Sequence, residues 1–218
     1  MKKNLTEVVF ILDRSGSMSG LESDTIGGFN SMLEKQKKEK GDALVSAVLF
    51  ATSFERLYDR ENIKTVKKMT AKDYSVGGCT ALLDALGDSI NHIANIHKEL
   101  GDEAPEKTIF IITTDGLENA STEYSYEAIK KLVSKMQKKN KWEFLFLGAN
   151  IDAIDAAGNI GIRSDRAVNY KCDKKGTSLN FDVLSKAVSN FRSCEVGCAD
   201  AALANWDEEI VEDIKKRG

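Results

Sequence analysis

Three short segments rich in small polar residues contain most of the chemistry that this sequence offers. They are Asp13-Arg14-Ser15-Gly16-Ser17, Gly77-Gly78-Cys79-Thr80 and Thr113-Thr114-Asp115-Gly116. Each segment offers oxygen donors together with a glycine, which lets the backbone turn tightly. The candidate ligands among them are two carboxylates and three hydroxyls, which are hard ligands and suit Mg²⁺ or Mn²⁺ rather than Zn²⁺ or copper; they belong to Asp13, Asp115, Ser15, Ser17 and Thr80. The segments therefore predict a site for a hard divalent metal ion.

The spacing within the first segment allows its oxygens to converge. In an extended turn, side chains two positions apart lie on the same side, so Asp13, Ser15 and Ser17 can face one point. Asp13 and Asp115 each follow a predicted strand. If the sheet is wound outward from the first strand, these two strands are neighbours and the two acids face each other at its switch point.

Apolar runs typical of strands alternate along the chain with segments of helical periodicity. Predicted strands cover Glu7 to Leu12, Ala43 to Phe50, Phe54 to Asp59, Thr108 to Thr113, Phe144 to Leu147 and Ala167 to Tyr170. Predicted helices cover about Gly20 to Lys38, Ala81 to Leu100, Tyr126 to Met136, Ile151 to Ala157 and Thr177 to Cys194. The short turn between the second and third strands indicates an antiparallel hairpin. We therefore predict an α/β three-layer sandwich with a doubly wound, mostly parallel central sheet and one antiparallel edge strand.

The composition is typical of one folded domain and excludes several classes of protein. The chain has 218 residues, of which 42% are apolar and 30% charged, and its formal net charge is −3. It is too apolar for a disordered chain and too evenly charged for a polybasic nucleic-acid arm. Its apolar runs are far shorter than the ~20 residues that a membrane helix needs. We therefore expect a partner that is neither nucleic acid nor membrane.

Two features predict a cytoplasmic protein. The apolar run after Met1-Lys2-Lys3-Asn4 is only Val8 to Leu12, which is shorter than the ~7–15 residues of a signal-peptide core. In a chain of this length the few cysteines are expected to be reduced thiols with small, buried side chains. These cysteines are Cys79, Cys172, Cys194 and Cys198.

At the three polar segments the sequence resembles the von Willebrand factor type A (VWA) domains. Asp13-Arg14-Ser15-Gly16-Ser17 matches the D-x-S-x-S motif of that family. Thr80 takes the place of its lone threonine, and Asp115-Gly116 the place of its second aspartate and the glycine that follows. The order and separation of the motifs also fit, over roughly residues 5–195. The resemblance implies a Rossmann-like fold and a metal-ion-dependent adhesion site.

Carried over residue by residue, the resemblance implies a set of metal ligands. Ser15 and Ser17 would bind the ion directly, Asp13 would hold ordered water and orient the serines, and Thr80 and Asp115 would complete the shell. A further position would stay open for an Asp or Glu of a partner protein. The implied ion is Mg²⁺, with Mn²⁺ or Ca²⁺ as alternatives. The resemblance thus implies an intracellular, non-enzymatic protein-interaction module, with residues 1–198 as its VWA-like domain and residues 199–218 as a charged tail or peripheral helix.

Each motif also has a simpler interpretation. Asp13 to Ser17 could be a polar turn, Thr80 the N-cap of the helix after it, and Asp115-Gly116 an ordinary turn. Asn150 or Asp152 could line the site, although the capping of a helix explains them as well.

An Mg²⁺-dependent hydrolase or phosphatase is the alternative function. Haloacid-dehalogenase-like enzymes also have an aspartate after the first strand of an α/β sheet, and usually a second aspartate two positions later as general acid and base. Here that position is Ser15, whose hydroxyl has no pKa useful for proton transfer. We therefore predict no catalytic residue. The sequence also lacks the glycine-rich motifs that bind ATP or dinucleotides.

Overall fold

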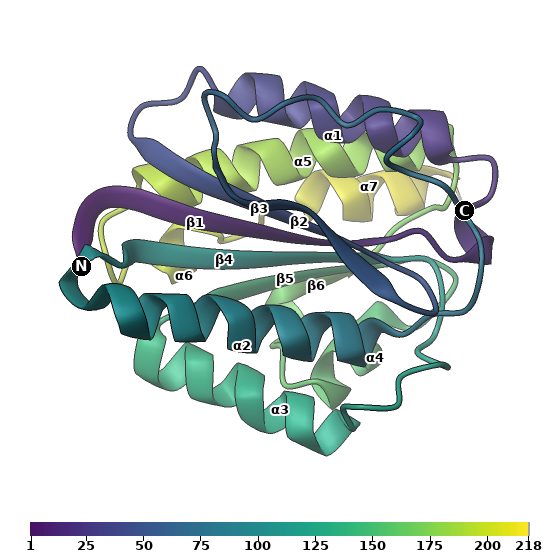
Figure 1. The fold of residues 1–218 in the computed structure, drawn as a ribbon. Helices are drawn as coiled ribbons and strands as arrows, with labels where there is room; N and C mark the ends of the chain where they lie inside the picture. Colours follow the sequence, from purple (N-terminus) through teal and green to yellow (C-terminus); the bar gives the residue numbers. More distant parts are fainter. Residues whose placement is uncertain (218) are drawn as a thin grey trace.

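Within residues 1–217, which the computed structural model describes, six strands form one central sheet (Figure 1). They are β1 Lys2–Asp13, β2 Asp42–Phe50, β3 Phe54–Asn62, β4 Pro105–Thr114, β5 Glu143–Gly148 and β6 Ala167–Asn169. Their order across the sheet is β3-β2-β1-β4-β5-β6. β3 pairs with β2 in antiparallel fashion and the other neighbours are parallel, which confirms the predicted doubly wound sheet with one antiparallel edge strand.

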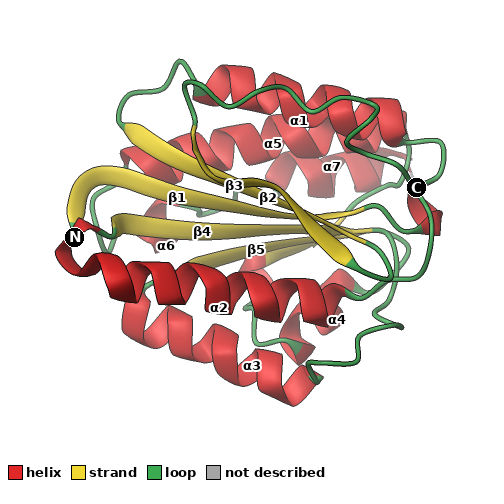
Figure 2. Ribbon diagram, viewed as in Figure 1, coloured by secondary structure: helices red, strands yellow, loops and turns green. Residues whose placement is uncertain are grey.

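Helices cover both faces of the sheet and complete three layers (Figures 1 and 2). One face carries α1 Glu22–Gln36, α5 Lys174–Ser193 and α7 Glu208–Arg217. The other face carries α2 Leu82–Leu100, α3 Tyr126–Lys135 and α4 Ala153–Asn159. Shorter turns are η1 Gly16–Met18, η2 Gly101–Glu103, η3 Met136–Asn140, η4 Ser164–Arg166 and α6 Ala199–Ala202. Of the helices in the described part of the chain, none is long and apolar enough to cross a membrane.

Alternate side chains of β1 enter two different cores, which explains why this strand lies in the middle of the sheet. Phe10 and Leu12 pack in the core beneath α1 and α5, whereas Val9 and Ile11 pack in the core beneath α2 and α3. A parallel strand that is buried on both faces needs apolar residues at consecutive positions. Residues 8–12 supply them, which is the pattern that made this strand recognisable.

Some elements have boundaries that differ from the predicted ones. β1 begins at Lys2 instead of Glu7, and β3 ends at Asn62 instead of Asp59. Polar residues extend both strands through backbone pairing, so hydrophobic periodicity does not reveal the extensions. Helix α1 begins at Glu22 instead of Gly20, since the φ of Gly20 is +89° and lies outside the helical region.

Residues 199–217 pack against the core rather than lying apart from it. They form α6 and α7, and their apolar residues Leu203, Trp206 and Ile210 are buried in the core that α5 also contacts. Lys171 of the loop after β6 donates a hydrogen bond to the carbonyl of Arg217 at 2.9 Å. The end of α7 therefore lies near the loop that follows β6.

The carboxyl ends of the parallel strands meet at one edge of the sheet, where loops gather on the right of Figure 2. Leu12 of β1 pairs with Thr113 of β4, and Asp13 pairs with Phe50 of β2. The chain proceeds from β1 to β2 on one side and later returns to β4 on the other side. This edge is therefore the switch point of the sheet, where α/β proteins place their ligand sites.

Candidate metal centre

Asp13 is the buried carboxylate at the centre of this edge. Asp13 is the last residue of β1 and is 1% exposed. Its Oδ1 accepts a hydrogen bond from the backbone N–H of Ser15 at 2.6 Å. Its Oδ2 accepts from the Thr114 hydroxyl at 2.7 Å and from the Asp115 N–H at 3.3 Å. The Tyr74 hydroxyl donates to the carbonyl of Asp13, so both the side chain and the backbone of this residue are held in place.

Ser15 and Ser17 present two hydroxyl oxygens side by side. Their Oγ atoms are 3.0 Å apart, although Ser15 is buried and Ser17 is exposed. Adjacent ligands that are each ~2.1 Å from an octahedral ion are separated by about 3.0 Å. The spacing of these two oxygens therefore fits a pair of neighbouring ligands of one Mg²⁺ or Mn²⁺ ion.

The backbone of Thr80 is fixed by hydrogen bonds, and its hydroxyl lies near that of Ser17. A Cβ placed on Gly116 would lie 3.6 Å from both the Ser17 Oγ and the Thr80 Oγ1, so these hydroxyls flank the Gly116 backbone from two segments. The Thr80 N–H donates to Asn119 Oδ1 at 2.9 Å, and the Asn119 N–H donates to the Thr80 carbonyl at 3.0 Å. Thr80 is not the N-cap of α2, because Ala81 occupies that position and makes no side-chain capping bond.

Asp115 is the second buried carboxylate, with 3% of its surface exposed. Its Oδ2 accepts a hydrogen bond from the Cys172 thiol at 2.8 Å, and its Oδ1 accepts one from the Asn150 amide. Burial raises the pKa of Asp115, and the charge of Asp13 adds to that rise, while the two hydrogen bonds lower the pKa. Burial also raises the pKa of the Cys172 thiol, which stays protonated and can donate.

No cation compensates these two carboxylates in the described part of the chain. Their hydrogen-bond donors are backbone N–H groups, a hydroxyl, an amide and a thiol, all of them neutral. Within residues 1–217, no Lys, Arg or His forms an ion pair with either Asp13 or Asp115. Two buried like charges without a counterion are costly. A divalent cation is the kind of ligand that would remove this cost.

Backbone hydrogen bonds join the first two segments of the site. The Gly16 N–H donates to the Gly78 carbonyl at 3.0 Å, and the Gly77 N–H donates to the Arg14 carbonyl at 2.9 Å. Gly78 has a φ of +82°, and a Cβ there would lie 2.6 Å from the Thr52 hydroxyl. A glycine is therefore required at this position if the loop that carries Thr80 is to stay against the serine segment.

The donor set fits a hard divalent ion better than a soft one. The structure brings the hydroxyls of Ser15 and Ser17 together beside Asp13, links Asp115 to Asp13, and holds Thr80 close to Ser17. No cluster of three or more His, Cys, Asp or Glu residues suited to a metal occurs in residues 1–217. Oxygen ligands of this kind suit Mg²⁺, Mn²⁺ or Ca²⁺ rather than Zn²⁺.

Several residues that support the site were not expected from the sequence. Thr114, Asn119 and Cys172 hold Asp13, Thr80 and Asp115 respectively. Thr114 stands beside Asp115 in the chain, so its position was a usable signal. The other two come from a loop and from the segment after β6, and nothing local marks them.

Other side chains do not behave as the sequence suggested. Asn150 contacts Asp115 and does not cap a helix, whereas Asp152 does cap α4, through the N–H groups of Ile154 and Asp155. Cys79 and Cys198 are exposed and Cys172 and Cys194 are only partly buried, so the expectation that the cysteines are buried is wrong. Short-range sequence patterns do not show which side of a loop faces solvent.

Comparisons with known proteins identify the fold. A VWA protein from Catenulispora acidiphila aligns with a TM-score of 0.57 and 14% identity, over 85% of this chain and 42% of that chain. The ArnB paralog VWA2 from Sulfolobus acidocaldarius aligns with a TM-score of 0.53 and 18% identity, over 85% and 45%. This chain has the fold of a VWA domain. The manganese-loaded TRAP protein of Plasmodium vivax also shares this VWA fold, with a TM-score of 0.56 and 17% identity, over 82% of this chain and 73% of that chain.

The likeness to these proteins concerns the VWA fold and not the metal centre. No protein-family profile and no curated protein sequence matches the chain. The chain also spans less than half the length of the Catenulispora and Sulfolobus proteins. The evidence for function therefore comes from the residues of this VWA-fold protein itself.

Proposed function

We propose that this VWA-fold protein is a divalent-metal-dependent interaction module that binds an acidic side chain of a partner protein through the metal. The observation that carries the proposal is the pair of buried carboxylates, Asp13 and Asp115, with no cationic partner in residues 1–217. A divalent cation would supply the missing positive charge. Ser15, Ser17 and Thr80 would supply neutral oxygen ligands to it.

The charge balance explains why such a site would attract a further carboxylate. Asp13 and Asp115 already share their negative charge with several neutral donors, so they would quench a bound ion only partly. The hydroxyls add no charge. An Asp or Glu of a protein partner would then complete the shell, with Mg²⁺ as the favoured ion and Mn²⁺ or Ca²⁺ as alternatives. The manganese-loaded state of the TRAP protein supports the choice of a hard divalent ion.

The proposed role is binding rather than catalysis. In the described part of the chain, the two imidazoles lie away from the site: His92 contacts Asp59 and His97 contacts the buried Glu7. The site therefore holds no hydroxyl or thiol with an imidazole base beside it. The Mg²⁺-dependent hydrolase has no observation in its favour, since Ser15 stands where its general acid would be.

We also propose that the interaction takes place inside the cell. All four cysteines are free, and Cys79 and Cys198 are exposed, which suits a reducing compartment. Fractionation of cells that produce the native protein, followed by thiol labelling without prior reduction, tests this setting.

Titration with Mn²⁺, followed by electron paramagnetic resonance, tests the metal site directly. We expect the double variant Ser15→Ala/Ser17→Ala to bind Mn²⁺ at least about 100-fold more weakly than the native protein. Ser19→Ala is the matched control, because Ser19 is exposed and follows the same segment. Equal Mn²⁺ affinity in the double variant and the native protein would contradict the proposed site.

The same variants separate binding from catalysis. Capture of a protein partner that is lost with EDTA and in the double variant, but kept in Ser19→Ala, supports the interaction module. Turnover of generic phosphate esters that requires Mg²⁺ and disappears in Asp13→Asn would instead support the hydrolase.

A further inference from the structure

Large apolar side chains are exposed on one side of the candidate metal centre. Leu117 is 62% exposed, Ile154 is 48% exposed and Tyr126 is 42% exposed. Leu117 follows the Asp115-Gly116 motif, Ile154 lies in the first turn of α4, and Tyr126 begins α3. In Figure 1 the beginnings of α3 and α4 both lie at the end of the sandwich where the strands finish. We call these three residues the apolar rim.

Leu117 is held in its exposed position by the residues on either side of it. Gly116 lies against the hydroxyls of Ser17 and Thr80. The Glu118 carboxylate accepts hydrogen bonds from the N–H groups of Ala120 at 2.9 Å and Ser121 at 2.7 Å, and from the N–H of Leu83 at 2.9 Å. A loop fixed in this way does not fold the leucine down onto the protein. The fixed conformation of this loop therefore keeps Leu117 exposed.

The other two rim residues are anchored to the same region. Asn150, which donates to Asp115, lies four positions before Ile154, and the N–H of Ala153 between them donates to Asn169 Oδ1 at 2.7 Å. At the start of α3, Ser125 caps the helix by accepting from the Ala128 N–H. The backbone beneath each rim side chain is thus fixed by hydrogen bonds.

Three carboxylates on this side, those of Asp84, Glu118 and Asp152, accept hydrogen bonds from the backbone. Asp84 accepts hydrogen bonds from the N–H groups of Thr122, Glu123 and Tyr124, at 2.8 to 2.9 Å. Asp152 accepts from the first N–H groups of α4. These carboxylates and that of Glu118 are engaged by backbone N–H groups, and the exposed side chains of Leu117, Tyr126 and Ile154 are available to a partner here.

We propose that the apolar rim selects a partner segment in which a large apolar residue lies within about three positions of the acidic residue, a reach of ~10 Å in an extended chain. This inference rests on the proposed function, since the acidic residue is the one bound at the metal. Leu117 follows Asp115 by two positions and so lies beside the proposed metal site, and burial of apolar surface beside a charged contact adds affinity to an interface.

Selection from a displayed peptide library tests the inference. The library has a fixed central Asp with about five randomised positions on each side, and it is selected on the full chain with Mg²⁺ and eluted with EDTA. We expect Leu, Ile, Met, Phe or Trp to be enriched within about three positions of the Asp. A selected peptide should bind Leu117→Ser on the order of tenfold more weakly than the native protein.

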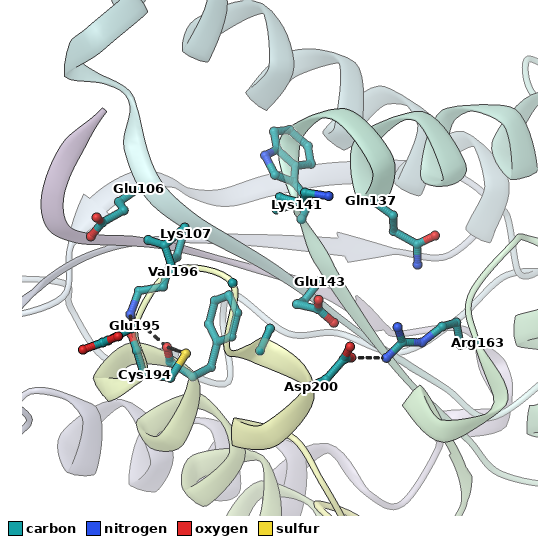
Figure 3. Close-up of a pocket in the computed structure, with 14 residues that line it drawn as sticks. Glu106, Lys107, Gln137, Lys141, Glu143, Arg163, Cys194, Glu195, Val196 and Asp200 are labelled. Atoms are coloured by element: carbon teal, nitrogen blue, oxygen red, sulfur yellow. Dashed lines mark hydrogen bonds and ion pairs between the residues drawn. The ribbon is translucent and has the colours of Figure 1, made fainter.

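Val196→Ser, at the opposite edge of the sheet, is a matched control variant. Val196 is 51% exposed and lines a separate pocket there (Figure 3), so Val196→Ser should leave peptide affinity unchanged. Unchanged Mn²⁺ affinity in Leu117→Ser shows that this variant keeps an intact metal site. A combined Ile154→Ser/Tyr126→Ser variant tests the rest of the rim with the same peptide.

The outcomes separate this inference from the proposed function. Peptides captured with Mg²⁺ but with no apolar enrichment, or with basic residues enriched, would overturn the inference alone. Failure to capture any peptide in an Mg²⁺-dependent manner would overturn both. A dimer that forms without Mg²⁺ and disappears in Leu117→Ser, measured by sedimentation, would show that a second copy of this chain covers the rim and would also overturn the inference.

Discussion

The buried charged side chains at the two edges of the sheet have different kinds of partner. At the edge where β4 and β5 begin, charged side chains line a pocket of about 420 Å³ and pair with one another (Figure 3). Arg166 contacts Glu143 at 3.2 Å and Asp200 at 2.7 Å. At the edge where the strands end, Asp13 and Asp115 contact only neutral donors in the described part of the chain. At the first edge the buried Arg166 has carboxylate partners, whereas at the second edge the two buried carboxylates have no cation in the described part of the chain.

A buried lysine at the first edge is satisfied by backbone carbonyls instead of by a carboxylate. The ammonium of Lys107 donates to the carbonyls of Phe191 at 3.0 Å, Arg192 at 2.6 Å and Cys194 at 2.7 Å. It thereby satisfies carbonyls at the end of α5, where a positive charge is favourable. The charges at this edge thus stabilise the fold. The two carboxylates at the other edge have no cation in residues 1–217, and this is the observation behind the proposed metal site.

The largest expected effect on stability comes from removing Arg166 at the edge where β4 and β5 begin. Arg166 is buried and holds Glu143, so Arg166→Ala should lower the free energy of unfolding by about 3 kcal/mol, because it leaves a half-buried carboxylate without its partner. Urea denaturation with and without Mg²⁺ measures this loss. The loss should be the same under both conditions, and an Mg²⁺-dependent loss would contradict the separation of the two edges.

The next largest effect is the gain in stability on binding of metal at the edge that contains Asp13 and Asp115. Mg²⁺ at about 100 times its dissociation constant should raise the free energy of unfolding by about 2.7 kcal/mol if it binds only the native state. Asp115→Asn should abolish this gain, because it removes one of the two charges that the ion balances. Thermal unfolding in Mg²⁺ and in EDTA measures both proteins.

The stability of Asp115→Asn without metal is a further test of the difference between the two edges. Without Mg²⁺, Asp115→Asn should be no less stable than the native protein, because it relieves the repulsion from Asp13. Glu143→Gln at the other edge is the matched change, and it should be destabilising since the buried Arg166 loses one of its charged partners. Equal destabilisation by both substitutions would show that the two edges do not differ as described.

The smallest of these effects concerns the loop that joins two segments of the site. Gly78→Ala should lower the free energy of unfolding by about 1–2 kcal/mol, because alanine is strained at a φ of +82° and its Cβ would meet the Thr52 hydroxyl. Mn²⁺ affinity should fall as well, since Thr80 follows two positions later. Gly27→Ala in α1 is the control, because a Cβ there meets nothing within 4 Å. A Gly78→Ala protein with native stability and native Mn²⁺ affinity would contradict the role assigned to this glycine.

Much of the fold was predictable because its signals are local. The consecutive apolar residues of β1 and the alternation of strands with amphipathic helices indicate the doubly wound sheet. The outer ends of β1 and β3 were missed, because their polar residues pair only through the backbone. The polar residues of the site were recognisable since each motif directly follows a strand or leads into a helix.

The supporting residues were beyond sequence reasoning. Cys172 and Asn150 approach Asp115 from segments 57 and 35 residues away, and no spacing rule connects them. Asn150 resembled a helix cap because short polar residues suit both roles. Only the packing of β5 and β6 beside β4 decided which role it has.

By itself, the sequence determined the type of sheet and the types of candidate ligand. Hydrophobic periodicity and the chemistry of carboxylates and hydroxyls are properties of the residues and their near neighbours. The tertiary structure alone decided that Asp13 and Asp115 share one buried edge with no cation in residues 1–217, and that Leu117 stands exposed beside them. These features depend on where distant segments come to lie, because electrostatic balance and solvent exposure are set by all neighbouring atoms in space and not by adjacent residues in the chain.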